Sequence, residues 1–172
     1  GGEVVLNGGK KIEKSWFTTY EENANLLVAD LKAHGITEYG RIKSVGYGTY
    51  ADTSDKNASP VLTIDGKYQV PARYPNSGYI KTSQIITGSD NTEDLSFKTS
   101  DSRVSNWAGE KDAWAFGYFK EEWADANLPV TVGEDGVITA NGKSHYGATK
   151  GSRFYIFNAL SELDTVGEYY ID

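Results

Sequence analysis

The sequence predicts an all-β fold, an antiparallel β-sandwich or barrel-like single domain with one or two short helical turns. Short runs rich in β-branched and aromatic residues recur along the chain, and such residues suit pleated, half-buried strands. Glycine follows Asp or Asn between several of these runs, which indicates tight turns. At 172 residues, without cysteine, the chain has the length of one domain that needs no disulfide, and we expect one β-rich domain over residues 1–172.

Two hairpins are predicted from their turns. Asp65-Gly66 separates the runs VLTI and KYQVPARY, and Asp135-Gly136 separates LPVTV from VITA. Both dipeptides suit the positive φ angles of two-residue hairpin turns. Asn141-Gly142 predicts a further turn shortly afterwards. Other strands are expected in EVVLNG, GYIKTSQIIT, DLSFKT, AWAFGYF, RFYIFN and EYYID.

Two segments have a less definite pattern. Residues 23–35, NANLLVADLKAHG, fit either a strand or a short amphipathic helix, because the apolar run is too short for periodicity to decide. Residues 158–164, NALSELD, contain helix formers but have room for only a turn or two. We expect one helical turn near residues 158–163.

The stretch KDAWAFGYFKEEWAD, residues 111–125, is unusually rich in aromatic rings. In a strand, Trp114, Phe116 and Tyr118 would share one face, opposite the smaller face that contains Ala115 and Gly117. The bulky face is the better candidate for the core, so Trp114 and Phe116 are expected to be buried. Two other tryptophans lie outside the alternating pattern and are the better candidates for display on the surface: Trp123 and Trp107.

The charge of the chain bears on its partners. A net charge of -7 would repel phosphate backbones, so nucleic acid is not expected as a partner. No apolar run approaches the length of a membrane span. The sequence therefore predicts a protein that binds neither nucleic acid nor membrane. We also expect a monomer, because the many Lys, Asp and Gly residues of the loops can blunt the strand edges.

Metal and cofactor chemistry has little support in the sequence. His34 and His145 are far apart and show no ligand spacing, and thiolate ligands are absent. Asp52, Asp55 and Asn57 offer oxygen atoms for calcium, but their spacing does not match a known calcium loop. We expect no cofactor, with calcium as the minor alternative.

Catalytic carboxylates would be needed for glycoside hydrolysis, which uses two of them. One group of candidates is Glu121, Glu122 and Asp125, and the other is Glu162, Asp164 and Glu168. Acidic residues are frequent in this chain, so such groups also arise by chance, and no catalytic residue is predicted. Arg73 and Arg153 each precede an aromatic residue, and we expect both to stack or pair in a structural role.

The abundance of aromatic rings is the main functional signal, with 4 Trp, 12 Tyr and 6 Phe. Aromatic faces hold the flat C–H faces of sugar rings, while polar groups at their edges meet the hydroxyls. The alternative is that these rings fill the core and cross-strand pairs of a β domain. The candidate carbohydrate-binding residues are Trp123, Trp107, Tyr118, Tyr146 and Asp125.

Several segments in order, including ARYPN, AWAFGYFKEEWAD and RFYIFNALSELDTVGEYYID, resemble the domain inserted in right-handed parallel β-helix proteins similar to glycoside hydrolase family 141. The resemblance spans nearly the whole chain. The family's usual Pro and Trp near the end are Val166 and Tyr169 here. The resemblance implies that the chain is a lobe from a secreted, polysaccharide-active system, whereas the catalytic activity would belong to the β-helix.

Three hypotheses follow. The first is a non-catalytic carbohydrate-binding module for plant cell-wall polysaccharide, secreted and associated with a polysaccharide-degrading system. The second is a structural insertion lobe of a β-helix glycoside hydrolase that shapes the cleft without binding sugar itself, and an exposed apolar patch would mark it. The third is a small glycosidase in its own right.

Overall fold

The computed structural model describes residues 8–48 and 59–172. The chain divides into two compact units, residues 1–40 and 41–172, and each is considered by itself. The all-β prediction is confirmed, because the regular structure of the described residues consists of strands and short 3₁₀ turns. The organisation of residues 1–172 as one domain stays a prediction.

The first unit contains an antiparallel hairpin of β1 (Thr18–Tyr20) and β2 (Asn23–Val28), preceded by the 3₁₀ turn η1 (Lys14–Trp16). The ambiguous segment at 23–35 therefore begins as a strand. Its second half forms a turn instead of a helix, in which Asp30 accepts a hydrogen bond from the amide of Ala33. Gly35, with φ of 74°, ends the turn.

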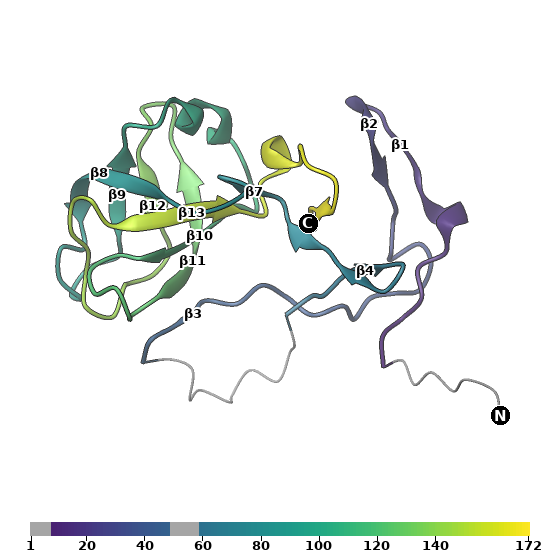
Figure 1. Ribbon diagram of the computed structural model, residues 1–172, viewed down its shortest axis with the longest axis horizontal. Helices are drawn as coiled ribbons and strands as arrows, with labels where there is room; N and C mark the ends of the chain where they lie inside the picture. The colour runs from purple at the N-terminus through teal and green to yellow at the C-terminus, as the bar shows by residue number, and fades with distance from the viewer. Residues whose placement is uncertain (1–7, 49–58) are drawn as a thin grey trace. The chain divides into compact units, whose positions relative to one another are not determined.

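The second unit contains a closed antiparallel barrel, built from six strands within the described residues (Figure 1). Each strand pairs with the next around the ring, and pairing of the first with the last closes it. Closure removes the exposed sheet edges that would otherwise pair with other chains. In ring order the strands are β10 (Trp114–Tyr118), β11 (Ala126–Val132), β12 (Ile138–Ala140), β9 (Ser96–Thr99), β8 (Ile80–Thr87) and β13 (Arg153–Phe157).

Short strands attach to the barrel or lie beside it. β3 (Val45–Gly46) pairs with the start of β11, and β7 (Arg73–Tyr74) pairs with β13. β14 (Glu168–Tyr169) runs parallel to β6 (Val70–Pro71), which ties the end of the chain to the segment that leads into β7. The 3₁₀ turns are η2 (Ser102–Trp107) and η3 (Leu160–Glu162), and η3 confirms the helical turn predicted near residues 158–163.

Both predicted hairpins are confirmed. Asp65 and Gly66, with φ of 50° and 73°, join β4 (Thr63–Ile64) to β5 (Lys67–Tyr68). The turn containing Asp135-Gly136 joins β11 to β12, and the amide of Gly133 donates to the carbonyl of Val137 to close it.

The barrel interior contains large side chains from some strands and small ones from others. Phe97, Phe119, Phe154, Ile138 and Ile156 are fully buried. β10 and the residue before it contribute Ala113, Ala115 and Gly117 to the same interior. A Cβ atom at Gly117 would lie 2.8 Å from Cβ of Phe154 and 2.9 Å from the carbonyl oxygen of Arg153. The inward-facing residues of β10 must therefore be small where phenylalanine side chains fill the interior.

The prediction that Trp114 and Phe116 belong to the core is therefore wrong. The alternation along β10 is as expected, but the small face points inward and the bulky face points outward, where Trp114, Phe116 and Tyr118 are half-buried. The outer rings pair across strands, because Trp114 lies opposite Phe157 and Phe116 opposite Tyr155. A narrow closed barrel has space for few large rings inside, so the remaining aromatics pack on its outer surface.

Candidate functional site

Four aromatic side chains from three separate segments of the barrel unit meet at one place, which we call the aromatic corner. Tyr47 follows β3, Trp123 lies between β10 and β11, and His145 and Tyr146 lie between β12 and β13. The ring centroids of Trp123 lie 4.8 Å from Tyr47 and 5.3 Å from Tyr146. His145 lies 5.2 Å from Tyr47 and 4.6 Å from Tyr146.

The rings of the corner form two walls. Tyr47 and Tyr146 stack at an interplanar angle of 28°. Trp123 stands across them, at 84° to Tyr47 and 69° to Tyr146. The Trp123 side chain is 58% exposed and Tyr47 is 39% exposed, so the corner offers aromatic surface to solvent.

The loop between β10 and β11 explains why Trp123 projects outward. The amide of Ala124 donates to the carbonyl of Glu121, which closes a turn. Ala124 is buried at 5% exposure. Because the small residue fills the inner side of this turn, the tryptophan beside it points into solvent.

Two glycines allow the backbone on either side of Tyr47 to approach the β10–β11 and β12–β13 loops closely. A Cβ atom at Gly46 would lie 2.5 Å from the carbonyl oxygen of Asp125, and one at Gly48 would lie 2.6 Å from Nδ1 of His145. Only glycine permits both approaches, and Gly48 also has φ of 88°. The amide of Tyr47 then donates a 3.0 Å hydrogen bond to the carbonyl of Asp125.

A pocket of about 340 Å³ adjoins the corner. Tyr47 and His145 belong to both the corner and the pocket wall. The polar side chains around the pocket can donate to and accept from hydroxyl groups. They belong to Asp125, Asn91, Ser144 and Lys143.

The hydroxyl of Tyr146 stays neutral near physiological pH. The pKa of Tyr146 is raised above its ordinary value of 10.0, first by a hydrogen bond with Tyr47, then by burial and by the charge of Glu121. A neutral phenol both donates and accepts hydrogen bonds. The corner therefore combines apolar ring faces with hydroxyl groups that can donate and accept hydrogen bonds.

The structure brings together some of the residues predicted for the site. Trp123 and Tyr146 lie in the corner, and Asp125 lines the adjoining pocket. Tyr118 lies on the outer face of β10, where the charge of Asp125 contributes to raising its pKa after the larger effect of burial. The guanidinium of Arg153 lies 4.3 Å from the Tyr118 ring centroid.

Trp107 does not belong to this site, and its predicted exposure is wrong. Its side chain is fully buried at the end of η2. The indole Nε1 donates a 2.6 Å hydrogen bond to Oε1 of Glu162. This bond gives the buried indole N–H the partner that it needs away from water.

Sequence reasoning missed Tyr47 and His145. Tyr47 is one of 12 tyrosines and lies far along the chain from Trp123. The available signal was the sequence Gly46-Tyr47-Gly48, because a ring between two glycines indicates close approach of the backbone to another segment.

The two arginines singled out in the sequence hold structure together, as expected. Arg73 donates from Nε to the carbonyl of Pro75 at 2.8 Å and from a terminal nitrogen to that of Gly78 at 2.6 Å, and its guanidinium lies 3.6 Å from the Tyr155 ring centroid. Arg153 forms an ion pair with Glu122 at 2.8 Å.

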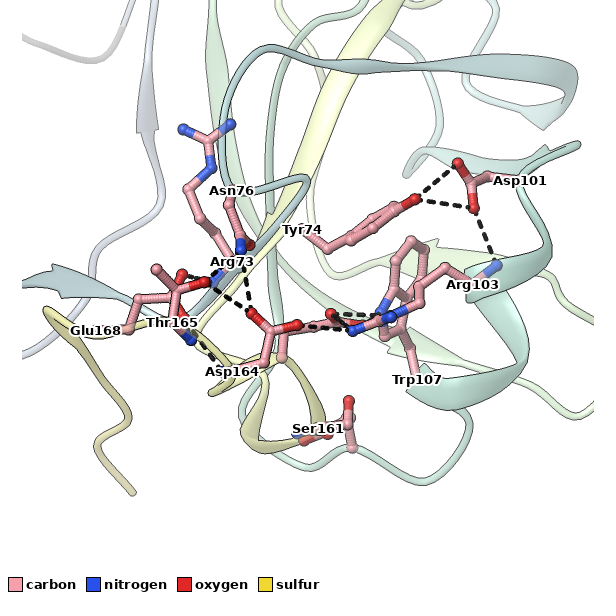
Figure 2. A network of polar contacts seen from close by, with 12 residues as sticks. Arg73, Tyr74, Asn76, Asp101, Arg103, Trp107, Ser161, Asp164, Thr165 and Glu168 are labelled. Carbon is pink, nitrogen blue, oxygen red and sulfur yellow. Dashed lines mark hydrogen bonds and ion pairs between the residues drawn. The ribbon is translucent and has the colours of Figure 1, made fainter. Parts of the chain in front are cut away.

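The second group of carboxylates considered for catalysis has structural partners, and Figure 2 shows the network around Asp164 and Glu168. Glu162 is fully buried, and Nε of Arg103 donates to both of its carboxylate oxygens, at 3.0 and 3.1 Å, while Nη2 donates at 2.7 Å. Asp164 accepts from Arg103 and from Asn76, each at 3.0 Å. Glu168 accepts hydrogen bonds from the backbone amides of Arg73 and Thr165. This network joins β7, η2, η3 and β14 and fixes the end of the chain.

The proposed calcium ligands Asp52, Asp55 and Asn57 lie outside the described residues. Within the described ranges, no group of three or more His, Cys, Asp or Glu side chains is arranged to hold a metal ion. No helix in those ranges is long and apolar enough to cross a bilayer.

Comparison with known proteins gives one weak neighbour. No protein-family model matches the chain, and no curated protein matches it. A solved structure of a glycoside hydrolase is similar with a TM-score of 0.46 and 23% identity, over 65% of this chain and 22% of its own. The chain thus spans about a fifth of the length of that protein, and the resemblance to the family 141 insertion domain stays a prediction.

Proposed function

We propose that this chain is a non-catalytic carbohydrate-binding module that holds plant cell-wall polysaccharide as part of a secreted polysaccharide-degrading system. The observation that carries the proposal is the 58% exposed Trp123 ring, held in the aromatic corner beside a mostly apolar pocket that a few polar side chains also line. A cluster of exposed rings such as Trp123 and Tyr47 marks an interaction site, and a concave site with a few polar groups is typical of small-ligand binding.

The chemistry of the corner fits a sugar. One face of a pyranose ring carries C–H groups that pack on an aromatic plane, and its hydroxyls need donors and acceptors at the edge of the ring. Trp123 provides the plane. Asp125, Asn91 and Ser144 provide polar groups along the adjoining pocket. Under this proposal the module works as a monomer and needs no cofactor.

Retention on immobilised polysaccharide tests the proposal. Native affinity electrophoresis against xyloglucan, xylan, mixed-linkage β-glucan and pectin should show retardation by at least one of them. Trp123→Ala should reduce the affinity by about tenfold or more, as expected for a central aromatic contact. Its melting temperature should stay close to that of the wild type, because the ring packs on other surface rings and not in the core.

Tyr68→Ala is the matched control. Tyr68 is 80% exposed on the β4–β5 hairpin and is not one of the residues of the aromatic corner. Its loss should leave polysaccharide retention unchanged. Equal loss of retention in the two variants, or no retention of the wild type on any of the four polysaccharides, would contradict the proposal.

A second candidate function has its own observation. The β4–β5 hairpin and the residues on either side of it expose apolar side chains, namely Val61 at 68%, Ile64 at 52%, Tyr68 at 80% and Val70 at 50%. An exposed apolar patch is the expected mark of a structural lobe that packs on another part of a larger enzyme. If the lobe has only this function, the chain binds no polysaccharide and replacement of Val61 and Tyr68 by polar residues improves its solubility.

A further inference from the structure

Resting on the proposed function, we infer that the aromatic corner binds soluble, non-crystalline glycan chains, one or two sugar units at a time, and does not bind the flat face of a crystalline polysaccharide. The angles between the exposed rings and the pocket beside them carry this inference. They define the physical form of the ligand, which the presence of aromatic residues alone does not.

A crystalline polysaccharide presents many sugar rings in one plane. A protein that binds such a face must display several aromatic rings that are coplanar, so that all of them touch it at once. In the corner, Trp123 stands at 84° to Tyr47 and 69° to Tyr146. A flat surface that lies on Trp123 therefore meets Tyr47 and Tyr146 edge-on and gains no second stacking contact.

The two tyrosines also do not form a platform by themselves. Tyr47 and Tyr146 are nearly parallel, at 28°, but they stack on each other with centroids 5.6 Å apart. Stacked rings cover part of each other's faces, so they present less area to a ligand than two rings side by side. Trp123 thus provides the main open face of the corner.

The next exposed ring on the barrel surface is not coplanar with its neighbour either. Tyr79 is 39% exposed and stands at 69° to Tyr118. The guanidinium of Arg153 lies 5.0 Å from the Tyr79 ring centroid and 4.3 Å from that of Tyr118. Tyr79 and Tyr118 therefore do not form a flat platform with each other, and a cation lies beside both rings.

The pocket beside the corner favours a ligand whose sugar rings have free edges that protein side chains can contact. Its volume of about 340 Å³ lies at the low end of the range for small-ligand pockets, which corresponds to one or two sugar units. Asp125 and Asn91 on its wall can meet hydroxyl groups at the edge of a sugar ring. In a crystal those edges are occupied by neighbouring chains, whereas a soluble chain leaves them free.

Two binding measurements on the full chain test the inference. The first is isothermal titration with soluble oligosaccharides, namely cellohexaose, xylohexaose and a xyloglucan heptasaccharide, together with the dimer and trimer of the series that binds. The second is sedimentation with microcrystalline cellulose and with α-chitin. Both are carried out with the wild type, Trp123→Ala, Tyr47→Ala and the control Tyr68→Ala.

The expected result is binding to at least one soluble oligosaccharide, with an affinity that has reached its plateau at the dimer, so that the trimer and the longer chain bind no more tightly. Trp123→Ala and Tyr47→Ala should each weaken this binding by about tenfold, while Tyr68→Ala leaves it unchanged. The wild type should not co-sediment with either crystalline solid. A melting curve followed by circular dichroism serves as the control that each variant is folded.

Two results overturn the inference, and they differ in their meaning. Sedimentation with cellulose or chitin crystals that depends on Trp123 would overturn the form of the ligand and leave the proposed function in place. Absence of binding to every soluble and solid glycan, by a folded wild type, would overturn the proposed function and the inference with it.

Discussion

The indole of Trp107 and the carboxylate of Glu162 form a fully buried hydrogen bond of 2.6 Å. Glu162 also pairs with the guanidinium of Arg103, 2.7 Å from one of its terminal nitrogens. A charged carboxylate inside a protein needs such partners, because its removal from water is costly. The pair connects η2 to η3, and so connects two loops that are distant in sequence.

Glu162→Gln should therefore destabilise the fold. The substitution preserves size and removes the charge, which leaves the Arg103 guanidinium with Asp164 as its remaining ion-pair partner. We expect a loss of about 3 kcal/mol in the free energy of unfolding, the low end for a broken buried pair because the Arg103 side chain is 34% exposed. Urea denaturation measures it. Glu134→Gln, on an exposed turn, should change stability by less than about 0.5 kcal/mol, and an equally small change for Glu162→Gln would contradict the assigned role.

Asp164 should contribute to the loss of stability in acid. Its pKa is lowered from 3.8, first by the hydrogen bond from Asn76 and further by Thr165 and Arg103, against an opposing effect of burial. The stabilisation is complete above the ordinary pKa and disappears as the pH falls through the lower folded value. Asp164→Asn should thus flatten the decline of the unfolding free energy below about pH 4, and Asn76→Ala should do so in part. If both variants keep the wild-type slope, Asp164 does not have this effect.

Trp114 and Phe154 should differ in their contribution to stability. Phe154 is fully buried in the barrel, so Phe154→Ala should cost about 3–5 kcal/mol. Trp114 is half-buried on the outer face, so Trp114→Ala should cost about 1–2 kcal/mol, in proportion to the apolar area it covers. Chemical denaturation of both variants gives the comparison. A larger loss for Trp114→Ala than for Phe154→Ala would contradict the inward direction of the small face of β10.

Arg73→Lys should weaken the structure around β7. Lysine cannot reproduce the forked donation to the carbonyls of Pro75 and Gly78 or the flat contact with Tyr155. We expect a loss of about 1–3 kcal/mol in the free energy of unfolding, and unchanged polysaccharide retention. Unchanged stability together with weaker retention would instead assign Arg73 to the binding site.

Much of the fold could be predicted from local sequence. The hairpins at Asp65-Gly66 and Asp135-Gly136 depend on φ angles that those residues adopt readily, and the turn near η3 depends on a few neighbouring residues. The alternation over residues 113–119 was also predicted correctly, because the side chains of a strand point to opposite faces whatever surrounds it.

Local pattern could not show which of those faces lies inside. The bulky face of β10 resembled a core face, but the closed ring of strands already contains Phe97, Phe119 and Phe154, and the contact made at Gly117 leaves no room for larger side chains there. The direction of the strand was decided by the volume of the barrel, which depends on residues from all of its strands.

The candidate site divides in the same way. Sequence alone identified Trp123, because it lies beyond a regular strand among acidic residues, and Tyr146 and Asp125 as polar or aromatic candidates. Only the tertiary structure brought Tyr47 and His145 to Trp123, through the close approach of Gly46 and Gly48 to other segments. Only the tertiary structure buried Trp107, because its hydrogen-bond partner Glu162 lies on a different loop. The composition of a chain determines which side chains are available, whereas contacts between distant segments determine which of them reach solvent.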